Sequence, residues 1–334
     1  MINFALIGAG RIGKVHAKNI LENNECNLLT VYDIDRKNSE FISKLNNSKI
    51  AESPEVAINN KEVDAVLIAS ATDTHIEFIL KSVKANKSIF CEKPIDLDIY
   101  KVNKCYDIVK NFSYPIQIGF NRRFDSNNIK LKKAKENGDI GNLEMIIITS
   151  RDPSPSTLEY HKSSGGLFKD CTIHDFDLSR FLLGDDPIEE INAFGSQLFS
   201  EQIKSINDHD TAMIQMKSKK GVLVHINNSR RAVYGYDQRV EIFGSKGMLI
   251  SNNYTQTNVE KFLKNATSIK DPILDFFIER YDKAYKSQLN HFVNSIINKQ
   301  MPLVNFDDGR KALILADHAY KSLKESKNII VNYE

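Results

Sequence analysis

Cysteine is scarce in this sequence, and its spacing excludes two common kinds of site. Four cysteines occur in 334 residues, namely Cys26, Cys91, Cys105 and Cys171. No two of them have the Cys-x-x-Cys spacing that is typical of zinc sites and redox pairs. We therefore expect four free thiols in a reducing compartment, no metal site and no disulfide chemistry.

Strong charge and long apolar runs are also lacking. Lys and Arg number 45 against 43 Asp and Glu, a net charge of +2, which does not favour binding to nucleic acid or to a membrane surface. No apolar run approaches the roughly 20 residues of a membrane span, and the first residues lack the pattern of a signal peptide. We expect a cytoplasmic globular protein whose length suits two domains.

A glycine-rich turn near the N-terminus predicts a dinucleotide site. Residues 2–7 have the pattern of a buried strand, Gly8, Gly10 and Gly13 follow as Gly-x-Gly-x-x-Gly, and residues 14–21 then read as a helix. Gly8 permits a tight turn, Gly10 lets the backbone approach a pyrophosphate, and Gly13 lets helix and strand pack closely. The helix N-terminus favours the negative charge of the ligand.

An acidic residue at the end of the next strand indicates which cofactor is bound. Asp33 follows the strand at residues 28–32, about 20 residues after the glycines, where a carboxylate accepts hydrogen bonds from ribose hydroxyls. The same charge repels a 2′-phosphate, so NAD is favoured over NADP. Arg36 lies nearby and can accommodate that phosphate, and Asp33 can also be a simple turn residue.

Two further strands end in residues that we expect near the cofactor. The strand at residues 63–69 precedes Ser70, Thr72 and Thr74, where the threonines can cap a helix or contact the cofactor. His75 fits the first turn of the following helix better than a catalytic role. The strand at residues 88–91 ends in Glu92-Lys93-Pro94. Lys93 can bind a substrate oxygen and stabilise negative charge there, or be a solvated loop residue.

Two features complete this domain. Pro94 raises the hypothesis of a cis peptide bond between Lys93 and Pro94. A last strand at residues 114–120 leads to Arg122 and Arg123, which can bind substrate hydroxyls or face solvent.

The remainder of the chain predicts a second domain with an open sheet. Strands are expected at residues 143–149, 190–195, 210–217, 222–228, 238–243 and 248–251, and helices at 284–298 and 309–325. Strands without intervening helices favour an antiparallel sheet. Residues 234–237, which include Tyr236, can place aromatic hydroxyls over a ligand or form a rim loop at a subunit contact.

The segment at residues 165–177 carries the candidate acid–base chemistry. After a glycine pair its pattern turns helical, and Asp170 and His174 lie four residues apart on one helix face, which Asp177 extends. The carboxylate can orient the imidazole, and the imidazole can take a proton from a hydroxyl. The alternative is an ordinary surface pair on an amphipathic helix.

Together the glycine motif, Glu92-Lys93-Pro94 and the segment from Gly165 to His174 resemble the glucose–fructose oxidoreductase, inositol dehydrogenase and rhizopine catabolism (Gfo/Idh/MocA) family. Residues 172–177 and 231–237 are most similar to its inositol dehydrogenases. The resemblance implies Lys93, Asp170 and His174 as the catalytic trio, with His174 as general base, and oxidation of a cyclitol hydroxyl with NAD. It also implies a homo-oligomer, a tetramer or dimer, and no metal.

The expected fold is α/β, with an N-terminal doubly wound parallel Rossmann sheet in residues 1–121. A C-terminal α+β domain with a large open, mostly antiparallel sheet follows in residues 122–334, and its last helix can pack back on the first domain. Arg123, Asp177 and Tyr236 are expected substrate contacts. The residues expected to bind the cofactor are Gly8, Gly10, Arg11, Ile12, Gly13, Asp33, Ser70, Thr72, His75, Glu92 and Lys93.

Two other functions remain open on the sequence. The enzyme could act on another sugar or amino-sugar derivative with NAD or NADP. The chain could also be a cofactor-binding regulator without turnover, although a regulator would not need Lys93, Asp170 and His174.

Overall fold

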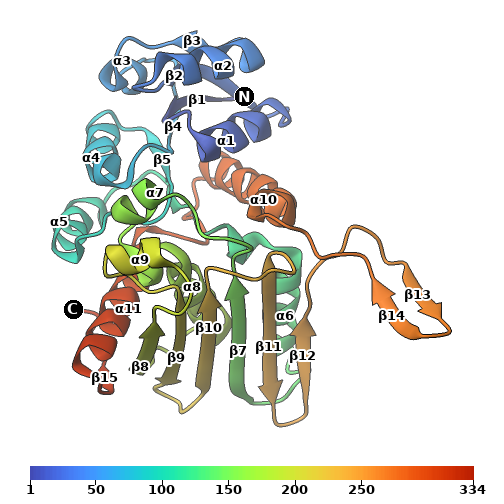
Figure 1. The fold of residues 1–334 in the computed structure, drawn as a ribbon. Coiled ribbons are helices and arrows are strands. Elements are labelled where there is room, and N and C mark those ends of the chain that lie inside the picture. The colour runs from blue at the N-terminus through green and yellow to red at the C-terminus, as the bar shows by residue number, and fades with distance from the viewer. The chain divides into compact units, whose positions relative to one another are not determined.

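The computed structural model describes residues 1–334, which form two compact units (Figure 1). The first unit contains Met1–Phe124 and Lys283–Leu313, and the second contains Asp125–Asp282 and Ile314–Glu334. Each of the last two long helices therefore contributes residues to both units. The expected division into a Rossmann domain at residues 1–121 and a substrate-binding domain at residues 122–334 stays a prediction.

The first unit is built on a parallel sheet with the strand order β3-β2-β1-β4-β5-β6. Its strands are β1 (Ile2–Ile7), β2 (Cys26–Tyr32), β3 (Lys49–Ile50), β4 (Ala65–Ile68), β5 (Ser88–Cys91) and β6 (Ile116–Ile118). Because β1 pairs in parallel with both β2 and β4, the strand order reverses between β1 and β4. Such a switch point opens a ligand crevice at the carboxyl ends of the strands. The predicted doubly wound sheet is confirmed.

Three helices of the first unit start at side-chain caps, whereas the first and the fourth have none. They are α1 (Arg11–Leu21), α2 (Arg36–Asn46), α3 (Pro54–Ile58), α4 (His75–Lys84) and α5 (Ile99–Val109), with short 3₁₀ turns at Thr72–Thr74 and Asn121–Phe124. Asp35, Ser53 and Asp98 accept hydrogen bonds from the first turns of α2, α3 and α5. The first turn of α1 has no side-chain cap and no acidic residue, so its N–H groups remain available to an anion.

An apolar cluster joins this sheet to the C-terminal part of the chain. Phe4, Leu6 and Phe90 from the strands pack with Leu289 and Phe292 of α10 (Phe277–Ile297). The rings of Phe90 and Phe292 meet edge to face, with centroids 5.6 Å apart. Residues from opposite ends of the sequence therefore share one core.

The second unit contains a seven-stranded sheet in the order β12-β11-β7-β10-β9-β8-β15. Its strands are β7 (Leu143–Arg151), β8 (Ile188–Ser196), β9 (Thr211–Ser218), β10 (Leu223–Ser229), β11 (Asp237–Gly244), β12 (Gly247–Ser251) and β15 (Ile329–Ile330). All neighbours are antiparallel except β7 and β10, which run parallel. The predicted large, mostly antiparallel sheet is confirmed.

One face of this sheet forms the core of the unit. Alternate side chains such as Ile146, Ile148 and Ile214 are buried and pack with apolar residues of three helices. These helices are α6 (Ser126–Glu136), α8 (Ile173–Leu183) and the second half of α11 (Phe306–Glu325). The start of α11 is capped: Asn305 and Asp308 each accept a hydrogen bond from the other's backbone N–H.

Several elements were not predicted from the sequence. They include α6 and β15, the short helices α7 (Leu158–Ser163) and α9 (Glu201–Ser205), a π-helical turn η3 (Phe168–Thr172), and a hairpin of β13 (Glu260–Leu263) and β14 (Ala266–Lys270). The hairpin extends away from the seven-stranded sheet (Figure 1). The strands and long helices that were predicted in this half of the chain are all present, with ends shifted by a few residues.

Candidate active site

The glycine turn has the geometry that a dinucleotide cradle needs. Gly8 has φ +95°, and a Cβ there would lie 2.4 Å from the backbone of Ala69 and Ser70. A Cβ on Gly13 would lie 2.2 Å from the carbonyl oxygen of Gly8. In contrast, a Cβ on Gly10 would meet nothing within 4 Å, so open space lies over the uncapped start of α1. Gly8 and Gly13 serve the packing of the turn, and Gly10 leaves room for a ligand.

Asp33 is fixed against this turn. Its Oδ2 accepts a hydrogen bond of 2.6 Å from the N–H of Ala9, and its Oδ1 accepts one of 2.8 Å from the N–H of Asp35. The side chain is half-buried, and a carboxylate can accept further bonds from ribose hydroxyls. Arg36 is exposed and pairs with Glu40, 3.3 Å away. The residues present fit NAD at this position.

The ends of β4 and β5 are tied together through His75. Its Nδ1 lies 2.8 Å from the carbonyl oxygen of Pro94, and its Nε2 lies 3.1 Å from that of Ser70. Burial lowers the pKa of His75, so a neutral ring donates to one of these carbonyls. Ser70 Oγ also bonds the hydroxyl of Thr74, and Thr72 opens the 3₁₀ turn between them. His75 is the first residue of α4, as expected, and its contacts hold the turn that follows Lys93.

Glu92 anchors the other side of Lys93. Its carboxylate is buried and lies 2.7 Å from Nε2 of His16, in α1. Its second oxygen accepts from the N–H of Lys93, and Gly119 leaves the room that this carboxylate occupies, since a Cβ there would lie 2.6 Å from it. The Lys93–Pro94 bond is cis, which confirms that hypothesis.

Neither arginine after β6 faces solvent. Arg122 and Arg123 are both 5% exposed, so the solvent-facing alternative was wrong. Arg123 donates to the carbonyl oxygen of Leu303 and lies 3.0 Å from the carboxylate of Asp308. Its part in substrate binding stays a prediction.

In the second unit, Asp170 and His174 lie on consecutive turns where a π-helical turn passes into α8. Asp170 belongs to η3 and is buried, whereas His174, the second residue of α8, is half-buried. Inserted π turns are frequent at functional sites, because they re-aim the side chains that follow. The glycines before this turn have φ values of +82° and +83°, at Gly165 and Gly166.

A cluster of charged and phenolic side chains surrounds Asp170, and it was not predicted from the sequence. Tyr160 in α7 donates a hydrogen bond of 2.6 Å to Asp170 Oδ1, and Arg230 after β10 donates one of 3.1 Å to Oδ2. Arg230 also lies 3.4 Å from Asp208, and it is only 2% exposed. No local spacing connects these residues, because they come from separate elements.

The other expected contacts of this unit are buried. Asp177 is 1% exposed, with Arg180 3.9 Å away. Tyr236 is 7% exposed and packs against the ring of Tyr281, with centroids 6.1 Å apart. Tyr234, in contrast, is exposed and donates to Asp237. The roles of Asp177 and Tyr236 stay predictions.

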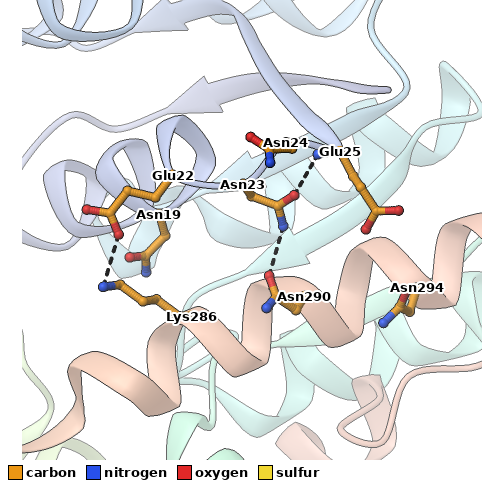
Figure 2. A pocket seen from close by; sticks show the side chains of 8 residues that line it. All are labelled: Asn19, Glu22, Asn23, Asn24, Glu25, Lys286, Asn290 and Asn294. Carbon is orange, nitrogen blue, oxygen red and sulfur yellow. Dashed lines mark hydrogen bonds and ion pairs between the residues drawn. The ribbon is translucent and has the colours of Figure 1, made fainter.

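Contacts within the first unit thus link the glycine turn with Asp33, Ser70, His75 and the turn at Lys93. Arg11 and Ile12 form the first turn of α1 beside this group. A separate polar hollow of about 430 Å³ lies at the other end of α1 (Figure 2). There Lys286 pairs with Glu22, and Asn23 donates to Asn290. The glycine turn and the hollow are therefore different sites.

Family models match both halves of the chain. The model of an oxidoreductase family with an NAD-binding Rossmann fold matches residues 2–120, and that of a GFO/IDH/MocA C-terminal domain matches residues 129–250. The chain belongs to the GFO/IDH/MocA oxidoreductase family. It is therefore an oxidoreductase of the NAD-binding kind, and the resemblance found in its motifs is confirmed.

Relatives and solved structures of this family match over nearly the whole length. Myo-inositol 2-dehydrogenase of Thermotoga maritima is 41% identical over 329 residues, 98% of each chain. A myo-inositol dehydrogenase structure from Corynebacterium glutamicum has a TM-score of 0.96 and 40% identity, covering 99% of both chains. That of scyllo-inositol dehydrogenase from Lactobacillus casei with NAD(H) and scyllo-inositol has a TM-score of 0.91 and 27% identity, covering 99% of both chains.

Two further findings concern residues 1–334 as a whole. No group of three or more His, Cys, Asp or Glu side chains is arranged to hold a metal ion. None of the helices combines the length and the apolar character that crossing a bilayer requires.

Proposed function

We propose that this protein oxidises a ring hydroxyl of myo-inositol or a related cyclitol to the ketone with NAD. The observation that carries the proposal is the position of His174 one turn after an anchored carboxylate, Asp170, in a chain 41% identical to a myo-inositol 2-dehydrogenase. Relatives named for both myo-inositol and scyllo-inositol support a cyclitol as the substrate class.

His174 is proposed as the general base. Its imidazole takes the proton of the reacting hydroxyl, a task for which this side chain is suited near neutral pH. Asp170 holds a negative charge beside it, which favours the imidazolium that forms, and accepts a hydrogen bond from a neighbouring hydroxyl of the ring. Lys93 donates to the reacting oxygen and stabilises the negative charge that develops there.

The first unit holds the cofactor in this proposal. The N–H groups at the start of α1 bind the pyrophosphate over Gly10, and Asp33 accepts from the adenosine ribose hydroxyls. Bound NAD supplies the hydride acceptor. Because Asp33 is fixed by two backbone N–H groups, it cannot easily turn away from a 2′-phosphate, which supports NAD rather than NADP.

The direct test measures NADH formation with a panel of myo-inositol, scyllo-inositol, aldoses and amino sugars, each with NAD and with NADP. We expect turnover with a cyclitol and NAD, and loss of turnover in His174→Ala. Turnover with sugars only would move the substrate to another class. Binding of NAD without turnover of any compound would favour a regulator and contradict the proposal.

We also propose that the protein is a homo-oligomer, a dimer or tetramer, formed through the uncovered face of the seven-stranded sheet. Exposed apolar side chains there are cross-strand partners: Phe194 with Met213, and Met145 with both Leu223 and Phe243. Two exposed apolar groups on one sheet favour association. Light scattering that gives the mass of a monomer would contradict this proposal. The cytoplasmic location stays a prediction, which the four free thiols favour.

A further inference from the structure

The carboxylate of Asp170 has a defined donor on each oxygen. Tyr160 donates to Oδ1 at 2.6 Å and Arg230 donates to Oδ2 at 3.1 Å. The two donors come from α7 and from the residue after β10, so they approach the carboxylate from different elements. A carboxylate bonded in this way on both oxygens cannot rotate without losing a hydrogen bond to a charged group.

Arg230 is itself anchored from behind. Its second guanidinium nitrogen lies 3.4 Å from Asp208 Oδ2, and its backbone N–H donates to the carbonyl oxygen of Asp210. Asp208 Oδ1 accepts from the N–H of Leu167, and a Cβ on Gly166 would lie 2.8 Å from that oxygen. The glycine at position 166 therefore opens the space in which Asp208 fixes Arg230.

We propose that Tyr160 and Arg230 are positioning residues that hold the Asp170 carboxylate in one orientation beside His174, with Asp208 anchoring Arg230. The role rests on the proposed dehydrogenase function. Neither residue needs to touch the substrate or the cofactor to act in this way.

The protonation of the cluster agrees with such a role. Burial raises the pKa of Tyr160, and the negative charge of Asp170 raises it further, so the phenol stays a donor. The guanidinium of Arg230 favours the charged form of the carboxyl that it contacts. Asp170 then remains an acceptor throughout the reaction, and the proton taken from the substrate stays on the imidazole of His174.

Two substitutions separate the donors. Tyr160→Phe removes one hydrogen bond without changing any charge, and we expect kcat to fall about tenfold or more while the KM for NAD stays unchanged. Arg230→Gln removes a positive charge, and this removal favours the imidazolium form of His174. We therefore expect the acid limb of the kcat–pH profile to move to higher pH by roughly one pH unit. Arg230→Lys keeps the charge and should restore the position of the limb.

Matched controls remove similar groups elsewhere in the second unit. Tyr254→Phe deletes a phenol that donates to Asn127, and it should leave kcat unchanged. Arg280→Gln breaks a buried ion pair with Asp125, at 2.6 Å, and should lower the Tm without moving the acid limb. A merely structural role for Arg230 would give the same result as Arg280→Gln.

The outcomes distinguish this inference from the proposed function. If the wild type oxidises a cyclitol and the Tyr160 and Arg230 variants keep its kcat and its pH profile, the positioning role is refuted and the function stands. If the wild type oxidises no polyol, the proposed function is refuted. Crystal structures of the wild type and of Tyr160→Phe then test the positioning role by themselves. An Asp170 carboxylate in the same orientation in both would overturn the positioning role.

Discussion

Replacing Gly10 by alanine should separate cofactor binding from folding. An added Cβ meets nothing within 4 Å, and the backbone at this position has φ −69° and ψ −160°, which alanine can adopt. At such a position the substitution restricts the unfolded chain and is expected to stabilise the protein by about 0.4–1 kcal/mol. The methyl group would, however, fill the space that a pyrophosphate needs over α1. We expect the Kd for NAD to rise at least about tenfold, a loss of about 1.4 kcal/mol.

Gly8 provides the opposite case. Alanine at this position is strained because the φ of Gly8 is +95°. Its Cβ would also lie 2.4 Å from the backbone of Ala69 and so overlap the end of β4. A left-handed residue costs roughly 1–2 kcal/mol, and the overlap adds to that cost. We expect Gly8→Ala to lose about 2 kcal/mol or more of unfolding free energy, which lowers the Tm by at least about 3 °C.

Thermal unfolding without cofactor and calorimetric titration with NAD measure the two quantities. Gly247→Ala is the control, because a Cβ there also meets nothing within 4 Å and the residue lies in the second unit. It should change neither quantity by much. If Gly10→Ala binds NAD as the wild type does, the open space over α1 is not the pyrophosphate site. If the Tm of Gly10→Ala is far below that of the wild type, Gly10 is needed for the fold instead.

Three further substitutions test other parts of the proposal. His174→Ala should lower kcat by about 10²–10⁴-fold while NAD still binds, because a general base acts only in the transition state; steady-state rates near those of the wild type would place the base elsewhere. Asp33→Ser should shift preference toward NADP, and an unchanged ratio of kcat/KM for NAD and NADP would show that Asp33 does not contact the ribose. Burial lowers the pKa of His75, so the unfolded chain binds a proton that the folded chain does not. Its stabilising contribution is complete above pH about 6.5 and decreases as the pH falls below that value. Chemical unfolding measured above and below pH about 6.5 should show that His75→Gln loses less unfolding free energy at the lower pH than the wild type does. An equal dependence of the unfolding free energy on pH in the two proteins would contradict the assignment.

The first unit could be predicted from the sequence because its signals are local. The glycines, the strand before them and Asp33 lie within 33 residues, and each has a backbone reason that operates within a turn or between adjacent strands. Buried parallel strands also appear as continuous apolar runs, such as Ala65–Ile68. The contacts of His16 with Glu92 could not be predicted, because the residues lie 76 positions apart and no spacing rule connects them.

Some features of the second unit could not be predicted, for a related reason. A sequence of consecutive strands suggested antiparallel pairs, but β7 lies between β10 and β11 and is parallel to β10. The helix that carries Tyr160 is six residues long, too short for an apolar period to identify it. Arg230 had no signal at all, since a buried arginine is recognised only by the carboxylates that surround it.

The two units hold their candidate groups by different physical means, and mutations should therefore have different effects in each. Around Gly10 the binding groups are backbone N–H donors at a helix start, which no substitution other than proline removes and which added volume can block. Around Asp170 the orientation depends on side chains, each of which a single substitution can delete. Changes in the first site should therefore act mainly on cofactor affinity. Changes in the second should act on the rate and its pH dependence, because the side chains removed there fix the charge beside the proposed base.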